Sequence, residues 1–118
     1  MASRREEQQE NARLRVMRLL SDNPKMSTRS LADAVGISNG AAYYVLRALV
    51  EKGFVKLERF SNNPRKKQYA YLLTRKGIVE KSLLTHSFIK RKRVEFEALR
   101  AEIKALQEEI PPKEAKIR

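Results

Sequence analysis

The chain has 118 residues, of which 42% are hydrophobic, which suits one domain with a modest core and leaves little room for a second. Lysine and arginine number 26 against 14 aspartate and glutamate, so the formal net charge is +12, and cysteine is absent. These values indicate an anionic partner, either nucleic acid or an anionic membrane surface, and they exclude a disulfide framework and a thiolate metal site.

The sequence has no apolar stretch of the roughly 18 residues that would span a bilayer, and its N-terminal "MASRREEQQE" lacks the apolar segment of a secretory signal. A cytoplasmic protein is the simplest expectation. The charge is unevenly distributed, because residues 54–76 carry 7 basic and 1 acidic side chains whereas residues 94–118 carry 5 and 6. The middle of the chain is therefore expected to meet the anionic partner.

The first third of the chain has the pattern of two helices. In "NARLRVMRLLSDNP" apolar residues recur at helical spacing, which predicts a helix from about Glu6 to the Asn23-Pro24 turn. Ser27 is placed to cap a second helix, and Gly36 suits its C-terminal end. The buried face of this second helix is expected to be Leu31, Ala32 and Val35.

A third helix is predicted at once in "SNGAAYYVLRALVEKG", with Ser38 as its cap and Gly53 at its end. Asn39-Gly40 is no hairpin signal here, because the flanking apolar residues recur at helical spacing. These residues are Ala42, Val45, Leu46 and Leu49. Two short helices joined by a tight glycine-containing turn are typical of a helix-turn-helix.

After Gly53 the apolar period changes from about 3.6 to 2, which predicts two strands, "FVKLERF" and "QYAYLLT". Val55 and Leu57 are expected on one face of the first strand. The inward face of the second stays open between Tyr69, Tyr71 and Leu73 on one side and Ala70 and Leu72 on the other. The segment 61–67 is longer than a tight hairpin loop and predicts a projecting wing.

Thr74 is expected to cap a last helix that runs to Ile110, where Pro111-Pro112 stops it. From Phe96 onward the apolar spacing is 3, 4, 3, 4, the heptad pattern of a coiled coil. Glu95 and Arg100 at flanking positions favour parallel pairing, and the alternative is that this helix folds back on its own winged domain. The residues expected to form the dimer contact are Ile89, Phe96, Leu99, Ile103, Leu106 and Ile110.

The predicted fold class is therefore mainly α with a small β-hairpin. It comprises a winged helix-turn-helix over residues 6–76, a coiled-coil-like dimerisation helix over 77–110 and a disordered tail over 111–118.

The stretches "LADAVGISNGAAYYVLRALVEKGFV" and "YAYLLTRKGI", with the trailing "FIKRKRVEFEALRAEI", resemble the MarR-type winged-helix transcriptional regulators over about residues 10–105. They look most like the short subgroup associated with bacterial exopolysaccharide gene clusters. The resemblance implies a homodimeric, nucleoid-associated regulator that binds double-stranded DNA. Larger MarR proteins frame a small-molecule pocket with helices from both termini, and this chain has only one short N-terminal helix, so no effector is carried over.

The second helix of a helix-turn-helix enters the major groove by its N-terminal end. Arg47 could read a guanine there or only contact phosphate, and Asn39 could read an adenine. Gly40 and Ala41 keep the helix end slim and permit close backbone approach. One tyrosine is expected to contact DNA and the other to lie partly in the core. The candidates on this helix are Ser38, Asn39, Gly40, Ala41, Tyr43, Tyr44 and Arg47.

Two further elements are candidate DNA contacts. Thr28 and Arg29 begin the preceding helix, at a place where phosphates are commonly held. The wing lies beside the minor groove when the recognition helix is docked, so its basic cluster is expected to contact DNA there, with Asn63 shaping the loop. That basic cluster is Arg65, Lys66 and Lys67.

Other functions remain as alternatives. The winged helix and heptad helix could serve as a protein-interaction scaffold, whereas RNA binding lacks an aromatic stacking platform. The run "KRKR" at 90–93 could approach flanking phosphates, grip an anionic lipid or stay solvated. No enzyme is expected, because the sole histidine, His86, has no partner residues for catalysis, and no cofactor or metal motif occurs.

Overall fold

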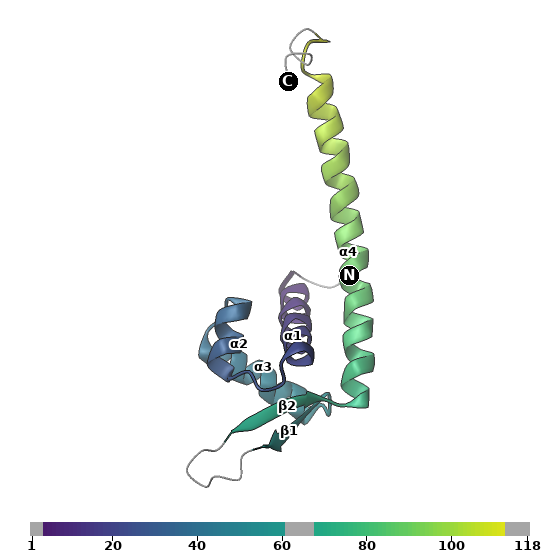
Figure 1. Ribbon diagram of the computed structural model, residues 1–118. Helices are drawn as coiled ribbons and strands as arrows, with labels where there is room; N and C mark the ends of the chain where they lie inside the picture. The colour runs from purple at the N-terminus through teal and green to yellow at the C-terminus, as the bar shows by residue number, and fades with distance from the viewer. Residues whose placement is uncertain (1–3, 61–67, 113–118) are drawn as a thin grey trace. The chain divides into compact units, whose positions relative to one another are not determined.

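The computed structural model describes residues 4–60 and 68–112. Residues up to Thr85 form one compact unit and those from His86 a second, and the last helix contributes to both. The predicted fold class, helices with a small β-hairpin and a long C-terminal helix, is confirmed (Figure 1). The elements in chain order are α1 (Arg4–Asp22), α2 (Thr28–Val35), α3 (Asn39–Glu51), β1 (Val55–Arg59), β2 (Tyr69–Leu73) and α4 (Arg75–Glu108).

Local capping fixes both ends of α2 and the start of α3 as the sequence predicts, whereas α3 ends at Glu51 with Lys52 as its C-terminal cap, one residue before the predicted Gly53. The Ser27 hydroxyl accepts a hydrogen bond from the Ser30 amide at 3.0 Å, and the Ser38 hydroxyl accepts one from the Ala41 amide at 3.1 Å. Gly36 ends α2 with a φ of 78°, a left-handed conformation that glycine adopts without steric cost. These caps satisfy backbone groups that a helix end would otherwise leave unpaired.

The core of the first unit lies where α1, α2, α3 and the base of the hairpin meet. Leu31, Ala32 and Val35 of α2 and Ala42, Leu46 and Leu49 of α3 are buried as predicted, while Val45 is only half-buried. Truncation of a buried leucine such as Leu49 costs about 2–5 kcal/mol, so these contacts hold the two helices of the turn in place. The remaining buried apolar residues are Leu14, Val16, Met17, Leu20, Phe54, Val55, Ala70 and Leu84.

The two strands pair antiparallel, with Val55 opposite Leu73 and Arg59 opposite Tyr69. Ala70 is the buried residue of β2, but Leu73, on the other face of the strand, pairs with buried Val55, so neither set of β2 residues is the single inward face. Val55 and Leu57 share one face of β1, but only Val55 is covered, and Leu57 is 45% exposed. The core ends at the base of the hairpin, and an alternating pattern does not reveal how far the cover extends.

Two contacts tie the hairpin to the helices. The Tyr71 amide donates to the Pro24 carbonyl at 2.9 Å, which anchors β2 to the segment between α1 and α2. Thr74 caps α4 by accepting from the Gly77 amide at 3.0 Å. A Cβ at Gly77 would lie 1.9 Å from the Phe54 carbonyl oxygen, so only glycine permits this close approach.

Helix α4 ends at Glu108, two residues before the predicted end at Ile110. The Ile110 amide donates to the Gln107 carbonyl at 3.2 Å, a tighter turn that closes the helix before Pro111. From Lys92 to Pro112 every residue is exposed. The expected disordered tail falls largely on residues 113–118, outside those described.

Candidate nucleic-acid interface

The exposed face of α3 carries the side chains predicted to meet DNA. Its buried side is occupied by Ala42, Leu46 and Leu49, which fixes the rotation of the helix and turns the opposite face outward. All the candidates on this outward face are exposed, together with the capping residue. They are Ser38, Asn39, Gly40, Ala41, Tyr43, Tyr44 and Arg47.

The expectation that one of the two tyrosines is partly core is wrong. Tyr43 is 57% exposed and Tyr44 is 74% exposed. Consecutive residues on a helix lie about 100° apart. The core side of α3 is occupied by Ala42, Leu46 and Leu49, and both tyrosines lie outside that side. Both phenol groups are therefore available to a ligand that approaches α3 from solvent.

Arg47 already has a partner in the free protein. Its Nε lies 3.1 Å from Glu51 Oε1, in an i, i+4 pair whose two side chains are both 66% exposed. An exposed pair of this kind contributes about 0.3–0.5 kcal/mol, so it leaves the guanidinium free to exchange partners. Glu51 was not identified from the sequence, although its spacing from Arg47 is the signal that predicts the pair.

Gly40 differs from the other glycines. Gly36 and Gly53 have φ values of 78° and 77°, and Gly77 lies against the Phe54 backbone. A Cβ at Gly40 would meet nothing within 4 Å, and the φ of Gly40 is not positive. The fold therefore gives no reason for glycine at position 40, whereas close approach of another molecule to this helix end would supply one.

The start of α2 lies beside the loop end of the hairpin, where β1 ends and β2 begins. A hollow of about 350 Å³ is lined by residues of both, including Ser27, Thr28, Gln68 and Tyr69. Lys25 also lines it, and its Nζ lies 4.7 Å from the centre of the Phe60 ring. Lys25 was missed in the sequence because it stands alone between two helices, and only the folded hairpin brings an aromatic ring to it.

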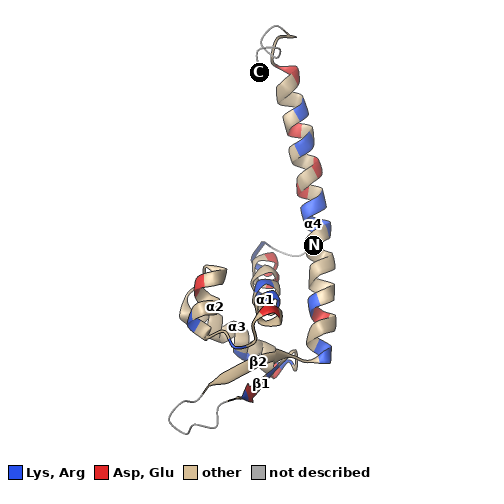
Figure 2. Cartoon of the chain, in the orientation of Figure 1, with Lys and Arg blue, Asp and Glu red and all other residues tan. Residues whose placement is uncertain are grey.

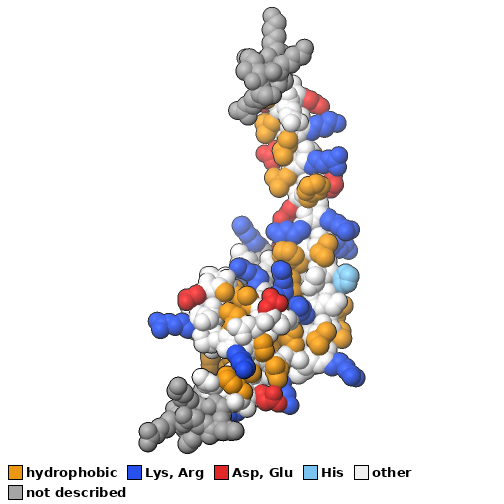
Figure 3. Space-filling model, viewed as in Figure 1, with side chains coloured by type: hydrophobic (Ala, Val, Ile, Leu, Met, Phe, Trp, Pro, Cys, Tyr) orange, Lys and Arg blue, Asp and Glu red, His pale blue; other side chains and the backbone are white. Residues whose placement is uncertain are grey.

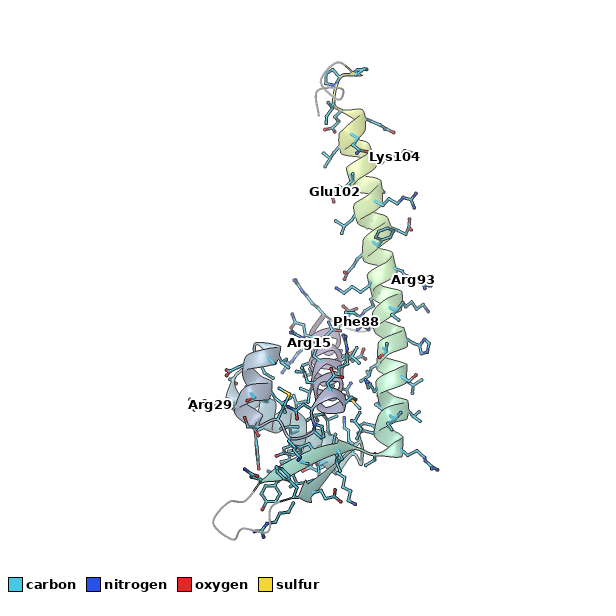
Figure 4. All side chains as sticks on the ribbon, viewed as in Figure 1. Arg15, Arg29, Phe88, Arg93, Glu102 and Lys104 are labelled. Atoms are coloured by element: carbon cyan, nitrogen blue, oxygen red, sulfur yellow. The ribbon has the colours of Figure 1, made fainter. Side chains whose placement is uncertain are left out.

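Arg29 is exposed on the side of α2 that faces away from α1 (Figure 4). Thr28 is half-buried at the first position of the same helix. The wing residues Asn63, Arg65, Lys66 and Lys67 lie outside the described residues. The flanking hydrogen bond, from the Phe60 amide to the Gln68 carbonyl at 3.1 Å, places both ends of the wing loop together.

Arg15 has a supporting role that the sequence did not predict. Its two terminal nitrogens donate to the carbonyls of Val35 at 3.1 Å and Ala34 at 3.3 Å (Figure 4). A guanidinium at these carbonyls satisfies acceptors at the C-terminal end of α2 and complements the helix dipole. This contact fixes α2 to α1 immediately before the turn that leads into α3.

A larger hollow, of about 750 Å³, lies between the N-terminal half of α1 and α3. Its lining includes Arg5, Arg13, Tyr44 and Lys52, with Ala48 on its apolar side. The Nε atom of Arg13 is buried without a hydrogen-bond partner.

The described residues also bear on metal binding, membrane crossing and the partners of the remaining charged side chains. They contain no group of three or more histidine, cysteine, aspartate or glutamate side chains that could hold a metal ion. His86 is exposed, as expected for a surface side chain. None of the helices in residues 4–60 and 68–112 is long and apolar enough to cross a membrane. In the run at 90–93, Lys92 donates to Glu95 Oε2 at 3.0 Å and lies 5.2 Å from the Phe88 ring.

Comparison with known proteins finds a family similar to the segment from α1 to β1. Residues 9–56 match the family described as winged helix-turn-helix DNA-binding. This segment is similar to winged helix-turn-helix DNA-binding domains. It contains the whole of α2, the turn and α3, and it reaches the start of β1. The expectation that the protein is not an enzyme agrees with this match to a family of DNA-binding modules.

Solved structures share the winged-helix fold at low sequence identity. A MarR/EmrR family transcriptional regulator from Acinetobacter sp. ADP1 is 22% identical, covers 82% of this chain and 72% of its own, and superposes with a TM-score of 0.57. The adhesin competence repressor AdcR from Streptococcus pyogenes is 21% identical, with 91% and 72% covered and a TM-score of 0.57.

A MepR mutant from S. aureus bound to an oligodeoxyribonucleotide is 16% identical, with 86% and 79% covered and a TM-score of 0.57. No protein among the curated sequences matches the chain. The likeness to these structures therefore establishes the fold, and the winged-helix segment is the part that sequence comparison assigns.

Proposed function

We propose that the protein is a homodimeric transcriptional regulator that binds specific double-stranded DNA sites. Helix α3 enters the major groove by its N-terminal end, and the basic wing follows the phosphates beside the minor groove. The observation that carries this proposal is the open end of α3, where Gly40 has no role in the fold and exposed Asn39, Tyr43, Tyr44 and Arg47 surround it.

The charges of the chain support the same function. The formal net charge is +12, and the excess of basic residues is greatest at 54–76, the segment that holds the hairpin. A protein that neutralises DNA phosphates with lysine and arginine releases counterions, so its affinity falls steeply with salt. Lys25 adds a positive charge to the hollow at the start of α2.

Each candidate residue has one proposed role. Arg47 reads a guanine after leaving Glu51, and Asn39 reads an adenine. Thr28, Arg29 and Ser38 position the domain on phosphates. The exposed Tyr43 and Tyr44 flank the groove floor. In the wing, Arg65, Lys66 and Lys67 contact phosphates and Asn63 shapes the loop.

The regulated genes are proposed to belong to an exopolysaccharide cluster. The support is the resemblance of the "YAYLLTRKGI" and "FIKRKRVEFEALRAEI" stretches to the short exopolysaccharide-associated MarR regulators. Sequencing of the DNA that the protein occupies in its own cells is the test. Sites upstream of polysaccharide biosynthesis genes are expected, and occupancy confined to other gene classes would overturn this assignment.

Binding itself is tested by anisotropy titrations of the full chain with duplex DNA, single-stranded DNA and RNA. The duplex is expected to bind most tightly, with a preference for sequences that a randomised-library selection enriches. Arg47→Ala is compared with Arg18→Ala, which removes an exposed arginine from α1. A chain that binds no duplex and instead retains a different protein through α4 would favour an interaction scaffold.

A further inference from the structure

The last turns of α4 are a helix without a partner in the described residues. Every residue from Lys92 to Pro112 is exposed, although the segment carries several large apolar side chains (Figure 3). An isolated helix of this length is marginal in water, so its stability must come from a contact with another chain or element. The exposed apolar residues at heptad spacing, each 46–60% accessible, are Phe96, Leu99, Ile103, Leu106 and Ile110, and Val94, 69% accessible, lies outside this set.

These residues form one narrow stripe. With Phe96 at heptad position a, Ile103 and Ile110 also fall at a, and Leu99 and Leu106 fall at d. A stripe of two positions in seven is the seam of a two-stranded coiled coil, whereas a helix that packs on a globular core has a wider apolar face. The spacing therefore specifies another helix of the same period as the partner.

The charges beside the stripe are sorted by position. The g positions hold only acidic residues, Glu95, Glu102 and Glu109, while the e positions hold Arg100 and Gln107. Acidic and basic residues are interspersed along this part of α4 (Figure 2). Glu102 and Lys104 project from different sides of the helix (Figure 4), because residues two positions apart on a helix are separated by about 200° around its axis.

We infer that two copies of this chain pair through residues 95–110 of α4 as a parallel coiled coil. In a parallel pair, position g meets the following e of the partner, so Glu95 lies beside Arg100 of the second copy, twice by symmetry. In an antiparallel pair that keeps heptad position a of one helix opposite position d of the other, each g position lies beside a g position of the partner, and each e position beside an e position. Such a pair would place Glu95 beside Glu109, Glu102 beside Glu102, and Arg100 beside Arg100.

The coil starts after the basic run. Continued toward the N-terminus, position d is Lys92, a charged residue that already bonds to Glu95 on its own helix. Parallel helices would bring the basic runs at 90–93 of the two copies together. The repulsion between these like charges limits the coiled-coil contact to Phe96 and the residues after it. Ile89, although exposed, therefore lies outside the coil.

Parallel pairing also fixes the symmetry of the dimer. The N-terminal ends of both coil segments lie at the same end of the pair, so both copies lead away from that end to their winged domains. A two-fold axis along the coil then relates the two domains, as an inverted-repeat DNA site requires. The pairing does not depend on DNA binding, and either proposal can fail without the other.

Cysteine cross-linking tests the direction, because the sequence has no cysteine of its own. A disulfide needs Cα atoms within about 7 Å. In a parallel pair the introduced cysteine side chains of the two Leu106→Cys chains face each other. In the antiparallel pair the two 106 positions lie about ten residues, or roughly 15 Å, apart along the coil. Ala101→Cys, at the outward position f, is the matched control.

The full-length Leu106→Cys protein is expected to cross-link to itself under mild oxidation far more than Ala101→Cys does. A mixture of Phe96→Cys and Leu106→Cys chains should give no preferred mixed disulfide. A dominant disulfide between positions 96 and 106 would establish the antiparallel arrangement and overturn the inference. Cross-linking of Leu106→Cys no greater than the control would overturn the pairing itself.

Charge exchange gives a second readout that does not rely on cysteine. Arg100→Glu should weaken self-association about 10-fold or more in sedimentation equilibrium, because two attractive pairs become repulsive. Adding Glu95→Arg to the same chain should restore the dissociation constant. If Arg100→Glu leaves self-association unchanged, position 100 does not face Glu95 of the partner and the parallel pairing is wrong.

Discussion

Replacing Gly40 with alanine should separate the stability of the fold from its affinity for DNA. Gly40 occupies the second position of α3, and a Cβ there would meet no atom within 4 Å. Alanine is a better helix former than glycine by about 0.8–1.0 kcal/mol in a helix interior. The gain in stability is expected to be smaller at position 40, because this residue lies in the first turn of the helix. The variant is therefore expected to unfold at the same temperature or up to about 8 °C higher.

The same methyl group should oppose DNA binding. If the backbone at Gly40 lies against DNA, the added Cβ overpacks that contact, which typically costs about 1–3 kcal/mol. That range corresponds to a loss of about 5- to 150-fold in affinity. A bulkier Gly40→Val variant should lose more affinity than Gly40→Ala.

Two measurements on the purified full chain check this prediction. Thermal unfolding followed by circular dichroism reports stability, and anisotropy with a selected duplex reports affinity. Gly77→Ala is the contrasting glycine variant, since its Cβ would lie 1.9 Å from the Phe54 carbonyl oxygen and must lower stability. A Gly40→Ala protein that binds DNA as tightly as the parent would refute close approach at this helix end.

Further predictions concern charged residues. Arg47→Ala should lose about 1–3 kcal/mol of binding free energy and relax one base preference in a library selection, and an unchanged site preference would exclude base reading. Glu51→Gln removes the ion-pair partner of the same guanidinium and should therefore tighten binding. Alanine at all three basic wing positions should reduce the log–log salt slope by up to about 2.7, and an equal effect of removing Arg4, Arg5 and Arg18 from α1 would assign it to overall charge. Arg15→Ala should lower the unfolding temperature, because two carbonyls of α2 lose their donor, and an unchanged midpoint would contradict that role.

Local features were predictable from the sequence because neighbouring residues determine them. The caps at Ser27 and Ser38 and the left-handed Gly36 follow from side-chain chemistry within a few positions, and the structure confirms all three. The buried faces of α2 and α3 follow from helical periodicity in the same way. The second helix of the turn could therefore be oriented before any coordinates were known.

Features that depend on distant segments could not be predicted. Leu57 is exposed because no element covers β1 beyond Val55, and alternation in the strand carries no information about cover. Arg15 meets carbonyls some 20 positions away, and Lys25 meets Phe60 only after the hairpin folds back. The exposure of both tyrosines on α3 likewise depends on the packing of the whole unit.

We propose that this protein reads a specific duplex sequence as a two-fold dimer. Selection of the purified full chain against a randomised duplex library, sequenced after several rounds, tests both parts together. A two-fold dimer should enrich an inverted repeat whose half-sites are centred about one helical turn, 10–10.5 base pairs, apart. A library that stays unenriched, or a single half-site without a symmetric partner, would contradict the proposal.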